Sequence, residues 1–186
     1  MAAAGAVGAA AAFVLTVEKL ALAADPGYTP TCSVNPVLSC GSVMSSAQAE
    51  AFGFPNPLIG LAGFPLLAGL GLLAATGTAL PRWTWLGVQA GVAFAVVFVH
   101  WLVFQSLYRI GALCPYCMAV WAAVIPAFWY VTLHNLQDGR LPSPRSWRRG
   151  IDAAARLHTA VLALWFAAIA ALVTQAFWDQ WTRMLA

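Results

Sequence analysis

The chain has 186 residues, of which 62% are hydrophobic and only 8% are charged, whereas a soluble domain normally carries about 25% charged residues. Its net charge of +3 is small, and most arginines gather in one loop, which indicates membrane topology rather than nucleic-acid binding. Few residues lie outside the apolar runs, which excludes a separate soluble domain. Composition therefore predicts an all-α polytopic membrane protein, folded as a single domain over residues 1–186.

Five apolar segments reach the roughly 20 residues that a membrane-spanning helix needs. We predict these helices at about residues 2–24, 57–76, 83–107, 112–134 and 157–178. The first is interrupted only by Glu18 and Lys19, near its end. The "ALAA" before Asp25 resembles a signal-peptide cleavage site, but the start lacks a basic region, so we favour a retained helix.

Basic residues predict which side of the membrane each connection faces. Arginines occupy the connections between the second and third segments and between the fourth and fifth, at Arg82, Arg140, Arg145, Arg148, Arg149 and Arg156. We predict that this side is cytoplasmic, as is the N-terminus, in the inner or plasma membrane of the cell. Lys19, Arg109 and Arg183 fall toward the other side, so the bias is clear but incomplete.

The loop over residues 25–56 then faces outward, as does the C-terminus. Its sequence "SCGSVMSSAQAEAFGFP" predicts a turn followed by a short helix at about residues 43–52. Ser42 or Ser45 can cap the start of this helix, and Gly53 fits its end. We expect the helix to lie at the membrane interface as a lid.

All four cysteines fall on the predicted outer side, where disulfides persist. Cys114 and Cys117 open the fourth segment as Cys-Pro-Tyr-Cys, and residues three apart on a helix are close enough for a disulfide. Pro115 suits the first helical turn. The free N–H groups of a helix N-terminus stabilise a thiolate, so we favour a redox-active pair over a structural disulfide.

Cys32 and Cys40 are separated by seven residues within the outer loop. Alone, such a pair is most often a structural disulfide, but beside an exposed Cys-x-x-Cys it suggests a relay of thiol–disulfide exchange. A zinc site formed by all four cysteines is the metal alternative, which we disfavour.

A relay that ends at a membrane helix needs an electron acceptor that dissolves in lipid, and a quinone is the natural candidate. Asn56 is a candidate hydrogen-bond donor to it, although Asn-Pro also suits a turn. Trp121, one helical turn beyond Cys117, is a candidate wall of the pocket, with core packing as its alternative. His100 and Gln89 are polar residues within a span, and we favour an interhelical hydrogen bond for His100.

Several motifs resemble the bacterial homologues of vitamin K epoxide reductase: "CSVNPVLSCGSVMSS", "FPNPLIG" and "CPYC" at the fourth helix. The resemblance implies a four-helix bundle around a quinone of the menaquinone, ubiquinone or vitamin K type, plus a fifth helix. Many bacterial members carry a fused thioredoxin-like domain. None follows in this sequence, so we expect a separate, DsbA-like extracytoplasmic protein as the partner.

The resemblance also implies roles for individual residues. Cys117 would face the quinone, Cys114 would exchange with Cys40, and Cys32 would meet the partner. Asn56 matches the residue that binds the quinone carbonyl, Ile59 is a further quinone contact, and Ser46 matches a supporting loop residue. Trp121 stands where animal enzymes carry a tyrosine, which leaves the contact with the second carbonyl open.

These observations predict a membrane thiol:quinone oxidoreductase that supports disulfide-bond formation. A disulfide-bond B type oxidase is disfavoured because its cysteine pairs come in the reverse order along the chain. Two further functions fit the same residues: reduction of vitamin K epoxide or quinone, and a non-enzymatic membrane protein with structural disulfides.

Overall fold

A computed structural model of the chain describes residues 1–25 and 27–185, and the regular secondary structure in this part is helical apart from one isolated β-bridge. Five helices are long and apolar enough to cross a membrane. They are α1 (Ala2–Ala24), α3 (Pro57–Ala75), α4 (Arg82–Gln105) with its π-helical extension η2 (Ser106–Ile110), α5 (Pro115–Gln137) and α7 (His158–Ala176). The predicted all-α polytopic membrane fold is confirmed.

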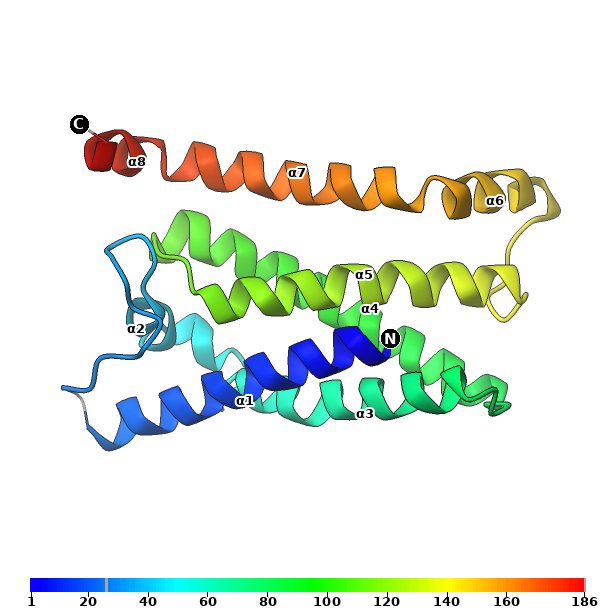
Figure 1. Cartoon of the computed structure of the whole chain (residues 1–186), viewed down its shortest axis with the longest axis horizontal. Helices are drawn as coiled ribbons and strands as arrows, with labels where there is room; N and C mark the ends of the chain where they lie inside the picture. Colours follow the sequence, from blue (N-terminus) through cyan, green and yellow to red (C-terminus); the bar gives the residue numbers. More distant parts are fainter. Residues whose placement is uncertain (26, 186) are drawn as a thin grey trace.

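The first four spans form a bundle, and α7 lies along its side (Figure 1). Helix α1 packs against α3 and α5, and α5 packs against α4. Helices α3 and α4 lack comparable packing against each other. The bundle is therefore less tightly closed between α3 and α4 than elsewhere, and this is where its main cavity lies.

Small residues allow α1 and α3 to approach closely. A Cβ added at Gly71 would overlap the backbone of Ala2, and one added at Gly60 would lie 3.0 Å from the Cβ of Ala12. Gly63 and Gly69 differ, because an added Cβ at either would meet nothing within 4 Å. Of these four glycines, only Gly60 and Gly71 are needed for the close approach of the two helices.

Helix α7 is attached to the bundle through a few specific contacts. The indole N–H of Trp165 donates to Nε2 of His100 at 2.9 Å, and His100 Nδ1 lies 2.7 Å from the Val96 carbonyl. The interhelical hydrogen bond predicted for His100 is thus confirmed. Phe177, directly after α7, is buried among residues of the bundle core. Apolar residues of α7, among them Leu162, Phe166 and Ile169, also pack against the core, but none is fully buried, so much of the helix surface remains for lipid.

The short lid helix that we predict at residues 43–52 is instead two pieces, α2 (Cys40–Met44) and η1 (Ala47–Glu50). The break falls at Ser46, whose backbone is extended and whose hydroxyl donates to the Val43 carbonyl at 2.6 Å. A local side-chain bond of this kind competes with helix continuation. The N-cap is Ser39, rather than Ser42 or Ser45.

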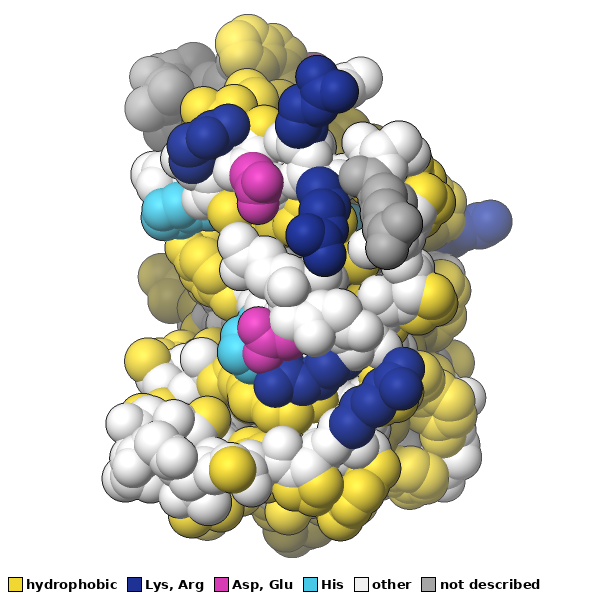
Figure 2. All heavy atoms as spheres, turned by 90° about the vertical axis from the view of Figure 1, so that its right-hand side faces the viewer, with side chains coloured by type: hydrophobic (Ala, Val, Ile, Leu, Met, Phe, Trp, Pro, Cys, Tyr) yellow, Lys and Arg dark blue, Asp and Glu magenta, His cyan; other side chains and the backbone are white. Residues whose placement is uncertain are grey.

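The two ends of the bundle differ in chemistry, and we name them by their residues. The cysteine end holds Cys32, Cys40, Cys114 and Cys117. The arginine end holds Arg82, Arg140 and the short helix α6 (Arg148–Arg156), which follows η3 (Arg145–Trp147). Figure 2 faces this end, where Lys and Arg side chains outnumber acidic ones. The side chains of Arg145 and Arg183, the latter in α8 (Trp178–Leu185), lie outside the described residues.

Candidate redox site

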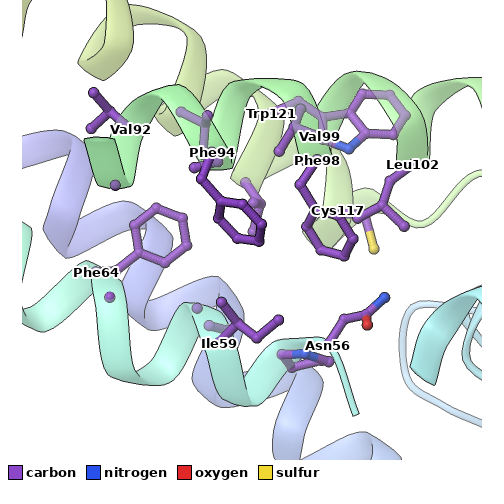
Figure 3. Close-up of a pocket in the computed structure, with 18 of the residues that line it drawn as sticks. Asn56, Ile59, Phe64, Val92, Phe94, Phe98, Val99, Leu102, Cys117 and Trp121 are labelled. Atoms are coloured by element: carbon purple, nitrogen blue, oxygen red, sulfur yellow. The ribbon is translucent and has the colours of Figure 1, made fainter. Parts of the chain in front are cut away.

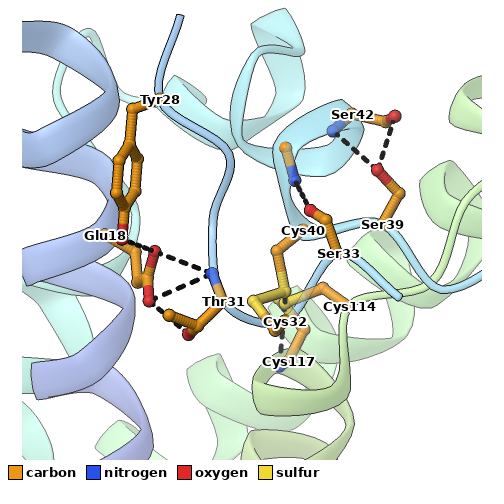
Figure 4. The surroundings of a disulfide bond; sticks show 11 residues. Glu18, Tyr28, Thr31, Cys32, Ser33, Ser39, Cys40, Ser42, Cys114 and Cys117 are labelled. Carbon is orange, nitrogen blue, oxygen red and sulfur yellow. Dashed lines mark hydrogen bonds between the residues drawn. A yellow bond between two sulfur atoms is a disulfide. The ribbon is translucent and has the colours of Figure 1, made fainter. Parts of the chain in front are cut away.

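The cysteine end brings the four cysteines together from two distant stretches of the chain (Figure 4). Cys32 and Cys40 form a disulfide with their Cα atoms 5.6 Å apart, whereas Cys114 and Cys117 are free thiols. The Sγ atom of Cys114 lies 3.0 Å from that of Cys40. Attack of Cys114 on Cys40 at this contact would release Cys32.

A backbone bridge places the loop disulfide against α5. Leu38 and Leu113 form an isolated parallel β-bridge. The N–H of Leu113 donates to the Val37 carbonyl at 2.7 Å, and the N–H of Ser39 donates to the Leu113 carbonyl at 2.9 Å. Because Ser39 and Leu113 each directly precede a cysteine, the bridge fixes the register between Cys40 and Cys114.

Local hydrogen bonds shape the loop between its two cysteines. The side-chain oxygen of Asn35 accepts from the N–H groups of Val37 and Leu38, at 2.9 and 2.8 Å. The hydroxyl of Ser33 accepts from the N–H of Gly41 at 3.1 Å. Asparagine and serine form such turns readily. The segment between Cys32 and Cys40 is therefore ordered by its own side chains.

Cys114 is the N-cap of α5, and Pro115 fills the first helical position. The Sγ atom of Cys114 accepts from the N–H of Cys117 at 3.5 Å. The pKa of Cys114 is lowered from its ordinary value, first by a hydrogen bond from the Cys117 thiol and further by backbone N–H groups of the first turn, while burial opposes the shift. A thiolate is therefore favoured at this helix start, as the sequence predicts.

The four cysteines differ in their exposure to solvent. Cys32, Cys40 and Cys114 are buried, with 6%, 0% and 1% of their surface exposed. The family resemblance implies that Cys32 meets an outside partner, but here no partner can reach it directly. The segment that carries Cys32 has to move before a protein thiol attacks it. Cys117 is half-buried and lines the main cavity.

The main cavity, of about 530 Å³, is lined by residues of α1, α3, α4 and α5. Figure 3 shows it with Asn56 and Cys117 near one end and with Ile59, Phe64 and Phe98 along its walls. Its lining continues to Trp83 and Gly87, near the arginine end of α4. It is long and almost wholly apolar, with most of its few polar groups at the cysteine end and Thr84 near the arginine end. These are the features expected of a site for an amphipathic ring with an apolar tail.

Asn56, at the start of α3, holds the lid loop in place. Its Nδ2 donates to the Gln48 carbonyl at 2.7 Å, and its Oδ1 accepts from the N–H of Ala51 at 3.1 Å. A carboxamide nitrogen carries two hydrogens, so one remains for a ligand in the cavity. The turn role that the sequence also allows is thus observed, and it leaves room for the binding role.

The other predicted pocket residues are distributed as follows. Trp121, Ile59 and Ser46 all line the cavity, and Trp121 is buried. Gln89 faces away from it, with its Nε2 donating to the Thr132 hydroxyl at 3.0 Å and its Oε1 accepting from Asn135 at 3.2 Å. Gln89 therefore belongs to a polar contact between α4 and α5.

Sequence reasoning missed an aromatic contact between the loop before α3 and two residues of α4. The ring of Phe52, in the lid loop, lies 5.4 Å from that of Phe98 and 6.1 Å from that of Phe94, both on α4. This contact spans from the loop before α3 to α4. Nothing distinguishes these rings in a chain with ten phenylalanines. Only the fold shows that Phe52 packs against two rings, Phe94 and Phe98, that line the cavity.

The possibility of a metal site is limited by the disulfide. The sulfur atoms of Cys32, Cys40 and Cys114 all lie within 4.8 Å of one another. However, a thiolate is the form that binds zinc, and the Cys32–Cys40 bond occupies two of the three sulfur atoms. In this state the group offers a metal ion one thiol, and redox exchange is the chemistry that the arrangement favours.

The fold and the site define a class: a polytopic membrane protein with two cysteine pairs joined at one end of a helical bundle. The model of the "Vitamin K epoxide reductase family" matches residues 1–132, well over half of the chain. The chain belongs to this family, which makes it a membrane oxidoreductase that works through cysteines. No individual curated protein matches the chain.

Proposed function

We propose that this protein is a membrane thiol:quinone oxidoreductase that reoxidises a thioredoxin-like protein through two cysteine pairs. The 3.0 Å contact between the sulfur atoms of Cys40 and Cys114 is the observation that carries the proposal. Thiol–disulfide exchange requires such contact between the attacking and the attacked sulfur. Cys117, three residues further along α5, borders the apolar cavity on the other side.

The exchange steps balance without an additional oxidant. A thiolate of the reduced partner attacks Cys32, and the second partner thiol resolves the mixed disulfide, leaving Cys32 and Cys40 as thiols. The Cys40 thiolate then attacks Cys114 of an oxidised Cys114–Cys117 pair and releases Cys117 as a thiolate. Attack of Cys32 on Cys40 restores the loop disulfide and frees Cys114. The structure corresponds to this last state, with an intact loop disulfide and two free thiols on α5.

The cavity supports a quinone as the final acceptor. A bound quinone takes up the two electrons and two protons that Cys114 and Cys117 give up as they form a disulfide. Asn56 has an amide hydrogen to offer one carbonyl, while Ile59 and Trp121 contribute apolar walls. The apolar length of the cavity suits an isoprenoid tail.

The partner and the orientation follow from the relay. A protein thiol has to reach Cys32 from water, so the cysteine end faces the extracytoplasmic side in this proposal. The arginines at the opposite end agree with a cytoplasmic location for that end. Labelling of cysteines by a membrane-impermeant reagent only from the cytoplasmic side would contradict this orientation.

The direct test mixes purified protein with a reduced DsbA-like protein and a soluble ubiquinone analogue and follows quinone absorbance. Cys117→Ala is expected to abolish quinone reduction, since Cys114 then has no partner for a disulfide on α5. Met118→Ala, the next residue and an exposed one, is the matched control and should leave the rate unchanged. Quinone reduction by Cys117→Ala at the wild-type rate would contradict the proposal.

A further inference from the structure

Two adjacent charged residues interrupt the first membrane helix. Glu18 has 5% of its surface exposed, and it is the only buried residue with a formal charge among the described residues. Lys19 is also largely covered, with 17% of its side chain exposed. Charged groups at such depth are costly unless they are paired. Neither residue exchanges thiols or electrons, although the charge of Glu18 opposes the lowered pKa of Cys114 and Lys19 lines the main cavity. Their bonding partners therefore indicate what they do.

Glu18 binds the segment that leads into Cys32. Its carboxylate accepts from the Tyr28 hydroxyl at 2.9 Å, and from both the N–H and the hydroxyl of Thr31. Figure 4 shows these bonds beside the disulfide. Thr31 directly precedes Cys32. The pKa of Tyr28 is raised from its ordinary value, chiefly because its hydroxyl donates to this carboxylate.

Lys19 binds the segment that follows Cys40. Its ammonium donates to the carbonyl of Met44, the last residue of α2, at 2.7 Å, and it pairs with Glu50 of η1 at 2.9 Å. Helix α2 begins with Cys40. The two neighbours on α1 therefore hold the chain on both sides of the disulfide, one before Cys32 and the other after Cys40.

We propose that Glu18 and Lys19 are positioning residues that clamp the disulfide loop over Cys114 and thereby control access to Cys32. While the clamp is closed, Cys40 stays in contact with Cys114 and Cys32 stays buried. When a partner thiol attacks Cys32, the bonds from Thr31 and Tyr28 to Glu18 have to break. The clamp thus favours the internal exchange, between Cys40 and Cys114, over the external exchange, between Cys32 and a partner thiol.

This inference rests on the proposed relay, so its test isolates the internal step. In a Cys32→Ser, Cys117→Ser background only Cys40 and Cys114 remain, and the fraction joined as a disulfide is measured against glutathione without quinone or partner. Adding Glu18→Ala is expected to lower the effective concentration of the two thiols at least tenfold. Tyr28→Phe, which removes one bond from the loop side, should lower it less.

The external step should change in the opposite direction. In the otherwise wild-type chain, Glu18→Ala is expected to accelerate reduction of the Cys32–Cys40 disulfide by a small water-soluble thiol severalfold. Asp152→Asn, which changes an exposed carboxylate of α6, is the control. It should change neither the effective concentration of the Cys40 and Cys114 thiols nor the rate of reduction of Cys32–Cys40. Thermal unfolding of each variant shows whether the fold is kept. If Glu18→Ala does not fold, Thr31→Val combined with Tyr28→Phe removes the side-chain bonds to Glu18 and leaves α1 intact.

Two results are distinguishable. If Cys40 and Cys114 form no disulfide even with Glu18 in place, the relay itself is wrong, and the clamp has no function to serve. The other result is that they do form the disulfide while the folded variants at Glu18, Tyr28 and Thr31 change neither the effective concentration of the two thiols nor the rate at which a small thiol reduces Cys32–Cys40. In that case the clamp is wrong while the relay stands. Hydrogen exchange at residues 28–33 provides an independent readout, because loss of the clamp should accelerate it.

Discussion

The sulfur atoms of Cys40 and Cys114 lie 3.0 Å apart although 74 positions separate the two residues in the chain. The contact joins the loop disulfide to the first turn of α5, and the backbone bridge between Leu38 and Leu113 keeps it in register. Single substitutions around this contact should therefore have separate, measurable effects on exchange, on thiol titration, on quinone binding and on stability.

The turn at Asn35 should control the rate of internal exchange. Asn35→Ala removes the acceptor for the N–H groups of Val37 and Leu38, each bond contributing about 1 kcal/mol. We expect thiol–disulfide exchange between Cys40 and Cys114 to slow roughly tenfold, which corresponds to about 1.4 kcal/mol. Rapid quench-flow with acid, followed by mass spectrometry, measures the rate of this exchange. Asn35→Asp keeps the acceptor and should stay near the wild-type rate; equal slowing in both variants would contradict this role.

The pH dependence of Cys114 should reveal its contact with Cys117. The pKa of Cys114 is lowered from the ordinary 9.0, so its thiolate forms as pH rises through a value below 9.0 and is lost as pH falls through that value. Cys117→Ala removes the largest cause and should move the titration toward higher pH. Ultraviolet absorbance of the thiolate measures the shift, followed in a Cys32→Ala, Cys40→Ala background in which Cys114 has no loop disulfide to attack. An unchanged titration curve would exclude Cys117 as the cause.

Filling the cavity should weaken quinone binding without touching a cysteine. Gly63 lines the cavity and has open space around its missing side chain. Gly63→Leu is therefore expected to raise the KM for quinone about tenfold or more, because the leucine occupies volume that the ligand needs. Gly69→Leu is the matched control: Gly69 lies on the same helix in equally open space but does not line the cavity. Similar KM values for the two variants would place the quinone elsewhere.

The bond between α4 and α7 should contribute to stability and little to catalysis. Trp165→Phe removes the donor to His100 Nε2, and hydrogen bonds between membrane helices contribute roughly 0.6 kcal/mol on average. We expect a small decrease in the midpoint of thermal unfolding and an unchanged kcat for quinone reduction. Trp178→Phe, at an exposed position, is the control. A large loss of activity in Trp165→Phe would show that α7 takes part in the site.

The sequence predicts much of the fold because hydropathy over about 20 residues is a strong signal. Helix α1 occurs at Ala2–Ala24, the range expected, and α3 and α7 end within a few residues of theirs. The lid is predicted less well because its break depends on one hydroxyl, that of Ser46, bonding back to Val43. A single side-chain bond of this kind leaves no periodic pattern in the sequence.

The residue types of the candidate site are predictable from the sequence, but the contacts that position the loop around Cys32 are not. Cys-x-x-Cys at a helix start indicates reactivity by itself, and the cavity does include Asn56, Ile59 and Trp121. By contrast, the bonds between Glu18 and Thr31 join residues 13 positions apart, and Thr31 directly precedes the buried Cys32. No spacing rule relates a membrane carboxylate to a loop threonine, so only the three-dimensional structure reveals this contact.

The most direct measurement of the central claim is trapping of the exchange between the two pairs. In Cys32→Ser combined with Cys117→Ser, no thiol remains to resolve a mixed disulfide, so mild oxidation should accumulate a Cys40–Cys114 disulfide, whereas Cys40→Ser combined with Cys117→Ser should yield little Cys32–Cys114 disulfide. Peptide mapping by mass spectrometry under non-reducing conditions identifies both products. The proposed relay predicts that the Cys40–Cys114 disulfide is the dominant crosslink. A dominant Cys32–Cys114 crosslink, or none between the loop and α5, would contradict it.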